Sequence, residues 1–211
     1  IDLNGTAYNS NDGAITFTGA VDLAGAGTVT INSDADAAGA DGAISITGAV
    51  SDTGTDSALT VTANTDTVAL ANVAVNGAIA VTGSTITLNG TAYTSTTDAI
   101  TLTGNVALGA GAVTTTLTSG AGAGDNITVT GTINDAGTDT ALTLDAGASG
   151  NVDLQGTVGN TGRPAALTVS NSAITDLNNV QTVGAIAVTA GTRIDLNGTA
   201  YNSNDGAITF T

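Results

Sequence analysis

The feature of this sequence that most constrains its fold is a long internal repeat. The eighteen residues IDLNGTAYNSNDGAITFT occur twice, letter for letter, starting at Ile1 and again at Ile194, so the two starts are 193 residues apart. A further copy begins between them, because ITLNGTAYTSTTDAITLTGNVAL from Ile86 aligns without a gap with the segment from Ile1. Self-similarity of this kind is typical of repeat architectures, in which each unit packs mainly on its neighbours.

The copies divide the chain into three parts. Residues 1–85 are a first half-copy, residues 86–193 are a second half-copy, and residues 194–211 begin the next identical period. The second half-copy is longer, because VDLQGTVGNTGRPAALTV from Val152 repeats ITVTGTINDAGTDTALTL from Ile127 at a spacing of 25 residues. A globular core rarely accepts such an insertion, whereas a stack of coils becomes one layer taller. The sequence therefore predicts a solenoid.

A short motif, [Ile/Val]-x-[apolar]-x-[Gly/Ala], begins each unit of the repeat. It alternates like a half-buried strand: Ile15 and Phe17 face one side, and Thr16 faces the other. Clusters of Gly, Asn and Asp separate the strands, and no stretch has a helical period. The motif starts at Ile15, Ile44, Ile79, Ile100, Ile127, Val152, Ile186 and Ile208. We expect an all-β parallel β-helix, or β-solenoid, with about seven to nine coils per 193-residue period and a rise of roughly 34 to 43 Å.

The composition agrees with a narrow core. Only 2% of the residues are aromatic, and Trp, Met, Cys and His are absent, although 41% are hydrophobic. A core one coil wide has room for branched aliphatic side chains and few rings. We interpret the recurring Tyr8, Tyr93 and Tyr201 as side chains that pack in a repeated corner.

The chain is strongly acidic. All eighteen acidic residues are Asp, only two Arg oppose them, and the formal charge is −16. Such a polyanion repels nucleic acid and anionic membrane surfaces and attracts divalent cations. Asp favours turns, so we expect these residues at the corners of the β framework. No apolar run is long enough to cross a bilayer and no signal peptide is present, so we expect any export signal or anchor to lie outside this segment.

The sequence does not favour catalysis. Nucleophile and base pairs usually require His, Cys or Lys, and all three are absent. Paired carboxylates, as used in glycoside hydrolysis, remain as an alternative. The available pairs are Asp34 with Asp36, Asp52 with Asp56, and Asp135 with Asp139. Because they lie in turn-rich segments, we favour solvated corners and expect neither an enzyme nor a resident cofactor.

Calcium is the metal that best suits the acidic turns. In DADAAGADG, the carboxylates of Asp34, Asp36 and Asp41 surround Gly39, and Ca²⁺ prefers flexible, oxygen-rich loops. These three residues are the candidate ligands of a calcium site, whereas diffuse counter-ion binding is the default expectation for so acidic a chain. The loop differs from an EF-hand, because it has no closing Glu.

Two surface patterns indicate further alternatives. Thr-Val-Thr triplets, for example at residues 60–62, suggest an ice-binding face, although unequal unit lengths count against a regular lattice. Four segments fit the asparagine-linked glycosylation pattern, although the recurring Asn-Gly-Thr in three of them is interpreted more simply as a turn followed by a strand. The four begin at Asn4, Asn89, Asn126 and Asn197.

The runs GAITFTGAVDLAGAGTVTI, GAISITGAVSDTGTDSALTVTA and GAIAVTGSTITLNGTAY resemble repeat regions of giant bacterial surface proteins with β-strand repeats, of filamentous haemagglutinin-like adhesins and of autotransporter passenger domains. The resemblance covers essentially the whole chain. It implies a right-handed parallel β-helix at the cell surface or outside the cell, serving as a structural repeat segment of a filament or adhesin shaft. It carries over no catalytic residues. We expect self-association into fibres along the axis and beside it, whereas a polysaccharide-active β-helix enzyme and a Ca²⁺- or ice-binding surface remain the alternatives.

Overall fold

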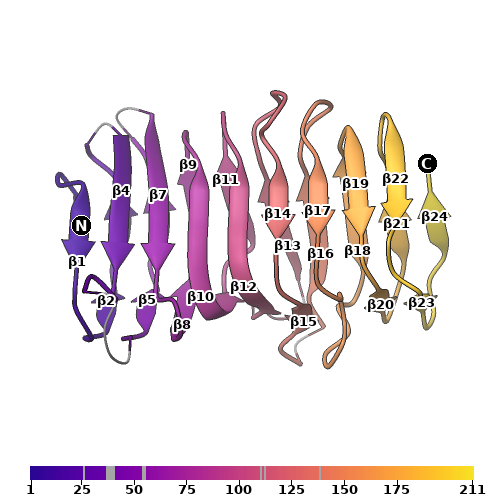
Figure 1. Cartoon of the computed structure of the whole chain (residues 1–211), viewed down its shortest axis with the longest axis horizontal. Coiled ribbons are helices and arrows are strands. Elements are labelled where there is room, and N and C mark those ends of the chain that lie inside the picture. Colours follow the sequence, from indigo (N-terminus) through magenta and orange to yellow (C-terminus); the bar gives the residue numbers. More distant parts are fainter. Residues whose placement is uncertain (26, 37–40, 54–55, 110, 112, 138) are drawn as a thin grey trace.

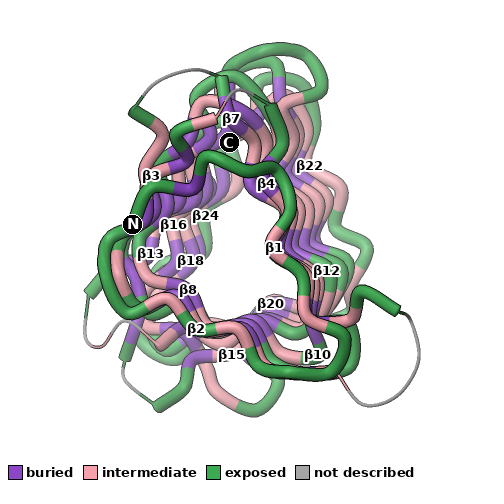
Figure 2. The backbone as a smooth tube through the Cα atoms, turned by 90° about the vertical axis from the view of Figure 1, so that its left-hand side faces the viewer, coloured by how far each residue is buried: buried purple, intermediate pink, exposed green. Residues whose placement is uncertain are grey.

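The computed structural model describes residues 1–25, 27–36, 41–53, 56–109, 111, 113–137 and 139–211. These residues form a parallel β-solenoid of about eight turns, and none of them lies in a helix (Figure 1). Seen from the N-terminal end, β1 (Ala7–Asn9), β2 (Ile15–Phe17) and β3 (Val21–Asp22) follow one another clockwise as the chain recedes, so the winding is right-handed (Figure 2). The all-β parallel solenoid expected from the repeat is confirmed.

Each turn of the solenoid has three sides, which we call faces 1, 2 and 3. Face 1 stacks β1, β4 (Gly27–Asn32), β7 (Ser57–Thr62), the first parts of β10 (Ile79–Leu88) and β12 (Ile100–Leu108), β14 (Ile127–Val129), β17 (Val152–Leu154), β19 (Ile174–Leu177) and β22 (Arg193–Leu196). Face 2 stacks β2, β5 (Ile44–Ile46), β8 (Thr67–Leu70), the second parts of β10 and β12, β15 (Ile133–Asp135), the single bridging residue Val158, β20 (Val180–Thr182) and β23 (Tyr201–Ser203). Face 3 stacks β3, β6 (Val50–Ser51), β9 (Val73–Val75), β11 (Ala92–Ser95), β13 (Thr114–Thr118), β16 (Ala141–Asp145), β18 (Leu167–Asn171), β21 (Ile186–Val188) and β24 (Ile208–Phe210).

The core consists of apolar rows that run along the solenoid axis. In each strand, alternate side chains point inward, and parallel in-register pairing places each one over its counterpart in the next coil. One row on face 2 contains Ile15, Ile44, Val68, Ile86, Val106, Ile133, Val158, Val180 and Tyr201. The expected stacking of Ile, Val and Leu is therefore present.

The 25-residue insertion forms one complete coil. Ile127 pairs with Val152 on face 1, and Leu142 pairs with Leu167 on face 3, each across 25 residues. The added coil thus repeats the inward and outward positions of its neighbour along these strands, up to an irregularity at the end of β16, where Asp145 pairs with Asn171.

A row of glycines marks the bend between faces 1 and 2. Gly104 has a φ of +137°, and a Cβ atom at that position would overlap the carbonyl oxygen of Gly83 in the preceding coil. Gly131 and Gly156 make the same close approach in the next two coils. The motif therefore ends in Gly at this bend because the backbone of the coil beneath occupies the space of a side chain.

Equivalent parts of the repeat lie on different faces. The segment Asn-Gly-Thr-Ala-Tyr leads into β1 on face 1, into β11 on face 3 and into β23 on face 2. Likewise, Asp2 pairs with Asp22 on face 3, whereas its exact copy Asp195 pairs with Asp176 on face 1. The same residues therefore fold into the same strands after a rotation about the axis.

The rotation follows from the number of sides in each copy. The chain passes eleven sides between Ile1 and Ile86 and fourteen between Ile86 and Ile194. Because each turn has three sides, twenty-five sides make eight and one-third turns. The copy that begins at Ile194 is therefore displaced by one face relative to the copy that begins at Ile1. The boundary between the half-copies at residues 85 and 86 falls inside β10, within the continuous stack.

Candidate functional sites on the outer surface

The loop predicted to bind calcium connects β4 to β5. Asp34 lies near its start and Asp41 near its end, while residues 37–40 lie outside the described residues. Both carboxylates contact one turn of the next coil: Asn64 Nδ2 donates to Asp34 Oδ2, and Thr65 donates to Asp41 Oδ2 from its backbone N (2.6 Å) and from Oγ1 (2.5 Å). The structure therefore brings Asp34 and Asp41 together over the Asn64–Thr65 turn.

These contacts influence the charge of the loop. The hydrogen bond from the Thr65 hydroxyl, followed by the one from its backbone N–H, holds the pKa of Asp41 below its ordinary value, and Asp34 contributes a smaller effect of the same sign. Asp36 lies on an exposed turn. Within the described ranges, no three acidic, His or Cys side chains are grouped as metal ligands. Calcium binding at Asp34, Asp36 and Asp41 stays a prediction, which isothermal titration of the purified chain with Ca²⁺ can measure.

The other carboxylate pairs act on the backbone of their own turns. Asp52 Oδ2 accepts a hydrogen bond from the backbone N of Ser57 at 2.9 Å. Asp135 is buried in the inner row of face 2, directly over Leu108, and accepts hydrogen bonds from the backbone N atoms of Asp139 and Thr140, each at 3.1 Å. Both carboxylates therefore bind backbone N–H groups of residues that follow them closely in the chain, in agreement with the turn preference of Asp.

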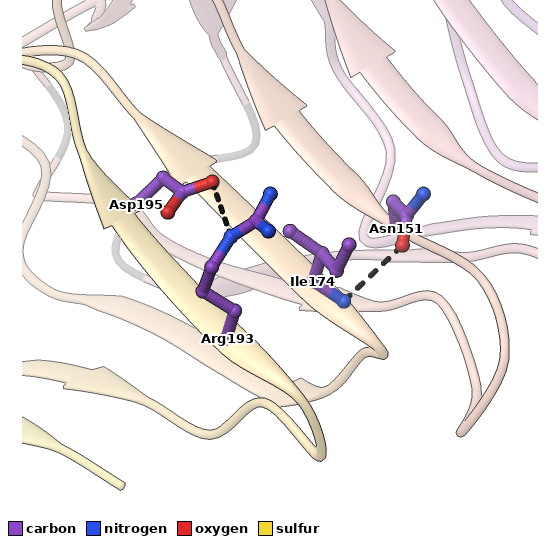
Figure 3. Close-up of polar contacts among 4 residues, drawn as sticks. All are labelled: Asn151, Ile174, Arg193 and Asp195. Atoms are coloured by element: carbon purple, nitrogen blue, oxygen red, sulfur yellow. Dashed lines mark hydrogen bonds and ion pairs between the residues drawn. The ribbon is translucent and has the colours of Figure 1, made fainter.

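Sequence reasoning missed a row of acids on face 1. Asp153, Asp176 and Asp195 occupy paired positions on β17, β19 and β22. Arg193 Nε donates to Asp195 Oδ2 at 2.7 Å, and on the same face the backbone N of Ile174 donates to Asn151 Oδ1 at 3.2 Å (Figure 3). The expectation that Asp lies at corners is wrong for these three, because each stands in the middle of a strand.

The acid row perturbs the titration of its central member. Burial raises the pKa of Asp176, and the hydrogen bond and negative charge of Asp195 raise it further. The charge of Asp153 acts in the same direction, whereas Arg193 opposes it. The recurring tripeptides Val-Asp-Leu, Thr-Asp-Leu and Ile-Asp-Leu were the sequence signal for this row.

Face 1 also carries two outward rows of threonine. The partly exposed side chains of the first row are Thr30, Thr60, Ala80, Thr101 and Thr128, and those of the second are Thr62, Thr82 and Thr103. The rows stay in register because the loops absorb the differences in unit length. The positions therefore align despite the unequal units, although Ala80 interrupts the first row of hydroxyl groups.

The recurring tyrosines form the corners that follow each Asn-Gly-Thr segment. The backbone N of the glycine donates to the tyrosine hydroxyl in all three copies, at 2.9 Å for Gly5 and at 2.8 Å for Gly90 and Gly198. In the second copy, the Tyr93 hydroxyl is buried, which raises its pKa. Corner packing of Tyr8, Tyr93 and Tyr201 is confirmed.

An asparagine of the preceding coil fixes the same corner from below. Asn72 Oδ1 accepts hydrogen bonds from the backbone N atoms of Thr91 (2.7 Å) and Ala92 (3.2 Å), and Asn179 does the same for the third copy. A Cβ atom on Gly90 would overlap Asn72. The middle residue of the segment is therefore Gly for a steric reason.

Comparison with known proteins returned no matching family model, no similar curated protein and no similar solved structure. Among the described residues there is also no apolar helix of a length that could cross a membrane.

Proposed function

We propose that this chain is a structural repeat segment of an extracellular bacterial filament or adhesin shaft, and that it acts through length and stiffness. The observation that carries the proposal is the insertion of the coil that begins at Ile127, which lengthens the stack while Ile127 stays paired with Val152 and Leu142 with Leu167. A chain that gains height by whole coils is suited to hold other parts of a protein at a distance from the cell.

The stiffness has a physical origin in the stacking. Parallel ladders join each coil to the next on every face, so bending or extending the rod strains many backbone hydrogen bonds at once. Each contributes about 1 kcal/mol net, and separating two coils also exposes the inner apolar rows. Separating two coils at any point therefore requires breaking a whole layer of contacts.

The test is how particle length depends on the number of copies. Chains with one, two and three copies of the 193-residue period should lengthen by about 40 Å per copy at roughly 4.8 Å per coil, with constant width, in electron micrographs and in solution scattering. A particle whose width grows with copy number contradicts the rod.

Lateral association is part of the proposal. A rod with a formal charge of −16 requires cations to lie beside another rod, so divalent cations should promote bundles, and a chelator at low salt should disperse them. Bundles that persist after chelation rule out cation bridging.

A second candidate function rests on the threonine rows of face 1. The first row places threonine hydroxyl and methyl groups on four of five neighbouring strands, with Ala80 at the fifth, and the second row adds three threonines, an outward arrangement that suits the ordering of water into ice. Thermal hysteresis in the native chain that is lost in Thr101→Tyr, but kept in Thr16→Tyr on face 2, supports this function. Absence of hysteresis in the native chain excludes it.

A further inference from the structure

We propose that the Asn-Gly-Thr corners at Asn4, Asn89 and Asn197 are acceptor sites for asparagine-linked glycosylation. The inference rests on the geometry of the corners and is independent of the shaft function.

The acceptor groups are exposed at all three corners. The asparagines Asn4, Asn89 and Asn197 and the threonines two residues after them are all exposed. Among the described residues, no side-chain hydrogen bond occupies the three carboxamides. At the second corner, the neighbour of Asn89 in the following coil is Gly109. A Cβ atom at that position would overlap Asn89 Oδ1, so the residue there has no side chain that could cover Asn89.

The backbone of each corner is held by hydrogen bonds that do not involve the side chain of the acceptor asparagine. The tyrosine hydroxyl holds the glycine N–H, and Asn72 or Asn179 of the coil beneath holds the two N–H groups that follow in the second and third copies. These backbone N–H groups thereby have partners, whereas the acceptor side chain is exposed to solvent.

The fourth segment with the glycosylation pattern provides an internal contrast. Asn126 Oδ1 accepts a hydrogen bond from the backbone N of Asn151 at 2.8 Å, and Ile127 donates its own N–H to the Asn151 carbonyl at 2.8 Å. Ile127 is fully buried and begins β14. This asparagine is part of the coil-to-coil ladder, so a transferase cannot reach it without separating two coils.

Rotation of the repeat distributes the three acceptors around the rod. Asn4 lies at the corner between faces 3 and 1, Asn89 between faces 2 and 3, and Asn197 between faces 1 and 2. Sugars at these positions therefore project from all three edges and do not compete for one side.

The reaction joins the asparagine to an activated sugar. Nδ2 forms a bond with the anomeric carbon of a nucleotide-activated hexose, the bond from that carbon to the diphosphate oxygen breaks, and the nucleoside diphosphate leaves. Nδ2 gives up one proton to a base of the transferase. The chain supplies only the exposed carboxamide and the neighbouring threonine hydroxyl.

The experiment compares the folded chain with a free peptide of residues 121–131. A soluble asparagine-linked transferase that modifies Asn126 in the peptide is incubated with the folded protein and a nucleotide-activated hexose, and peptides are mapped by mass spectrometry. We expect hexose on Asn4, Asn89 and Asn197 and at least a tenfold lower occupancy at Asn126. Asn89→Gln and Thr91→Val should each remove the sugar at Asn89 and leave the other two corners modified.

Two results would overturn the proposal. One is a folded protein that stays unmodified at the three corners under conditions where the peptide is modified. The other is mapping of the native protein, isolated from its own source, that finds all three asparagines bare. Neither result bears on particle length, so the shaft function is tested separately.

Discussion

The hydroxyl of Tyr93 donates a hydrogen bond to the Leu70 carbonyl oxygen at 2.8 Å, which ties the corner of one coil to the end of a strand in the coil beneath. The same hydroxyl accepts a hydrogen bond from the backbone N of Gly90. One phenol oxygen thus fixes both the shape of a corner and its attachment to the stack.

Replacing this phenol should destabilise the rod. Tyr93→Phe leaves the Gly90 N–H without its partner in a buried site and removes one of the two hydrogen bonds that the Leu70 carbonyl oxygen accepts, the other coming from the backbone N of Asn89, so we expect the free energy of unfolding to fall by about 1–3 kcal/mol. Urea denaturation measures the change. Tyr8→Phe is the matched control, because the Tyr8 hydroxyl accepts the glycine N–H but, among the described residues, makes no hydrogen bond to another coil, and its effect should be smaller. Equal losses would refute the role of the inter-coil bond.

The acid row predicts that neutralising Asp176 stabilises the chain at neutral pH. Like charges at paired positions cost roughly 0.2–1 kcal/mol, so Asp176→Asn should raise the free energy of unfolding by about that amount. Since the folded-state pKa of Asp176 is raised, its protonation favours the folded state, and this contribution is lost as the pH rises through that pKa. The advantage of the variant should therefore shrink as the pH falls toward 3.8. Asp12→Asn, in an exposed turn, should show no such trend.

Thr65 should control the ionisation of Asp41. Thr65→Val removes the hydroxyl donor, so the pKa of Asp41 should move upward toward its ordinary value, as followed by NMR titration of the carboxyl carbon. Because the native pKa is lowered, Asp41 contributes stability above the unfolded-state value that disappears as the pH falls through the folded-state value. The neighbouring Thr67→Val should leave the titration unchanged.

Removing one whole coil should leave a folded rod. Deletion of residues 127–151 joins Asn126 to Val152, which occupies the position of Ile127 in the next coil, and we expect a particle shorter by about 4.8 Å with unchanged β content by circular dichroism. Deletion of Thr128 alone should unfold this region, because it turns Val129 outward. A coil deletion that aggregates would show that the coils are not interchangeable.

Much of the fold could be predicted from the sequence, because strand alternation and stacking are local. Ile44 and Ile46 alternate with the polar residues Ser45 and Thr47, and the 25-residue duplication already indicates a removable layer. The face that each copy occupies could not be predicted. The unit from Ile44 to Ile79 spans one and two-thirds turns, whereas the unit from Ile100 to Ile127 spans one turn. The number of residues in a unit does not show how many of them form strands and how many form loops.

Some of the surface sites could be predicted from the sequence and others could not, for the same reason. The tyrosine corner was visible because Gly90 and Tyr93 are close in the sequence. The acid row was not, since Asp153 and Asp176 become neighbours only when the stacking partner of each strand is known. The partner of Asp41 was hidden for the same reason, because Thr65 lies one coil further along.

The one-third turn left over in each period has a mechanical consequence. In any tandem array of this period, an irregularity such as the wide loop between β4 and β5 moves to a new edge with every copy and returns to its original edge only after three. The irregularities of adjacent copies therefore lie on different edges, and an array of three or more copies resists flexing about equally in all directions.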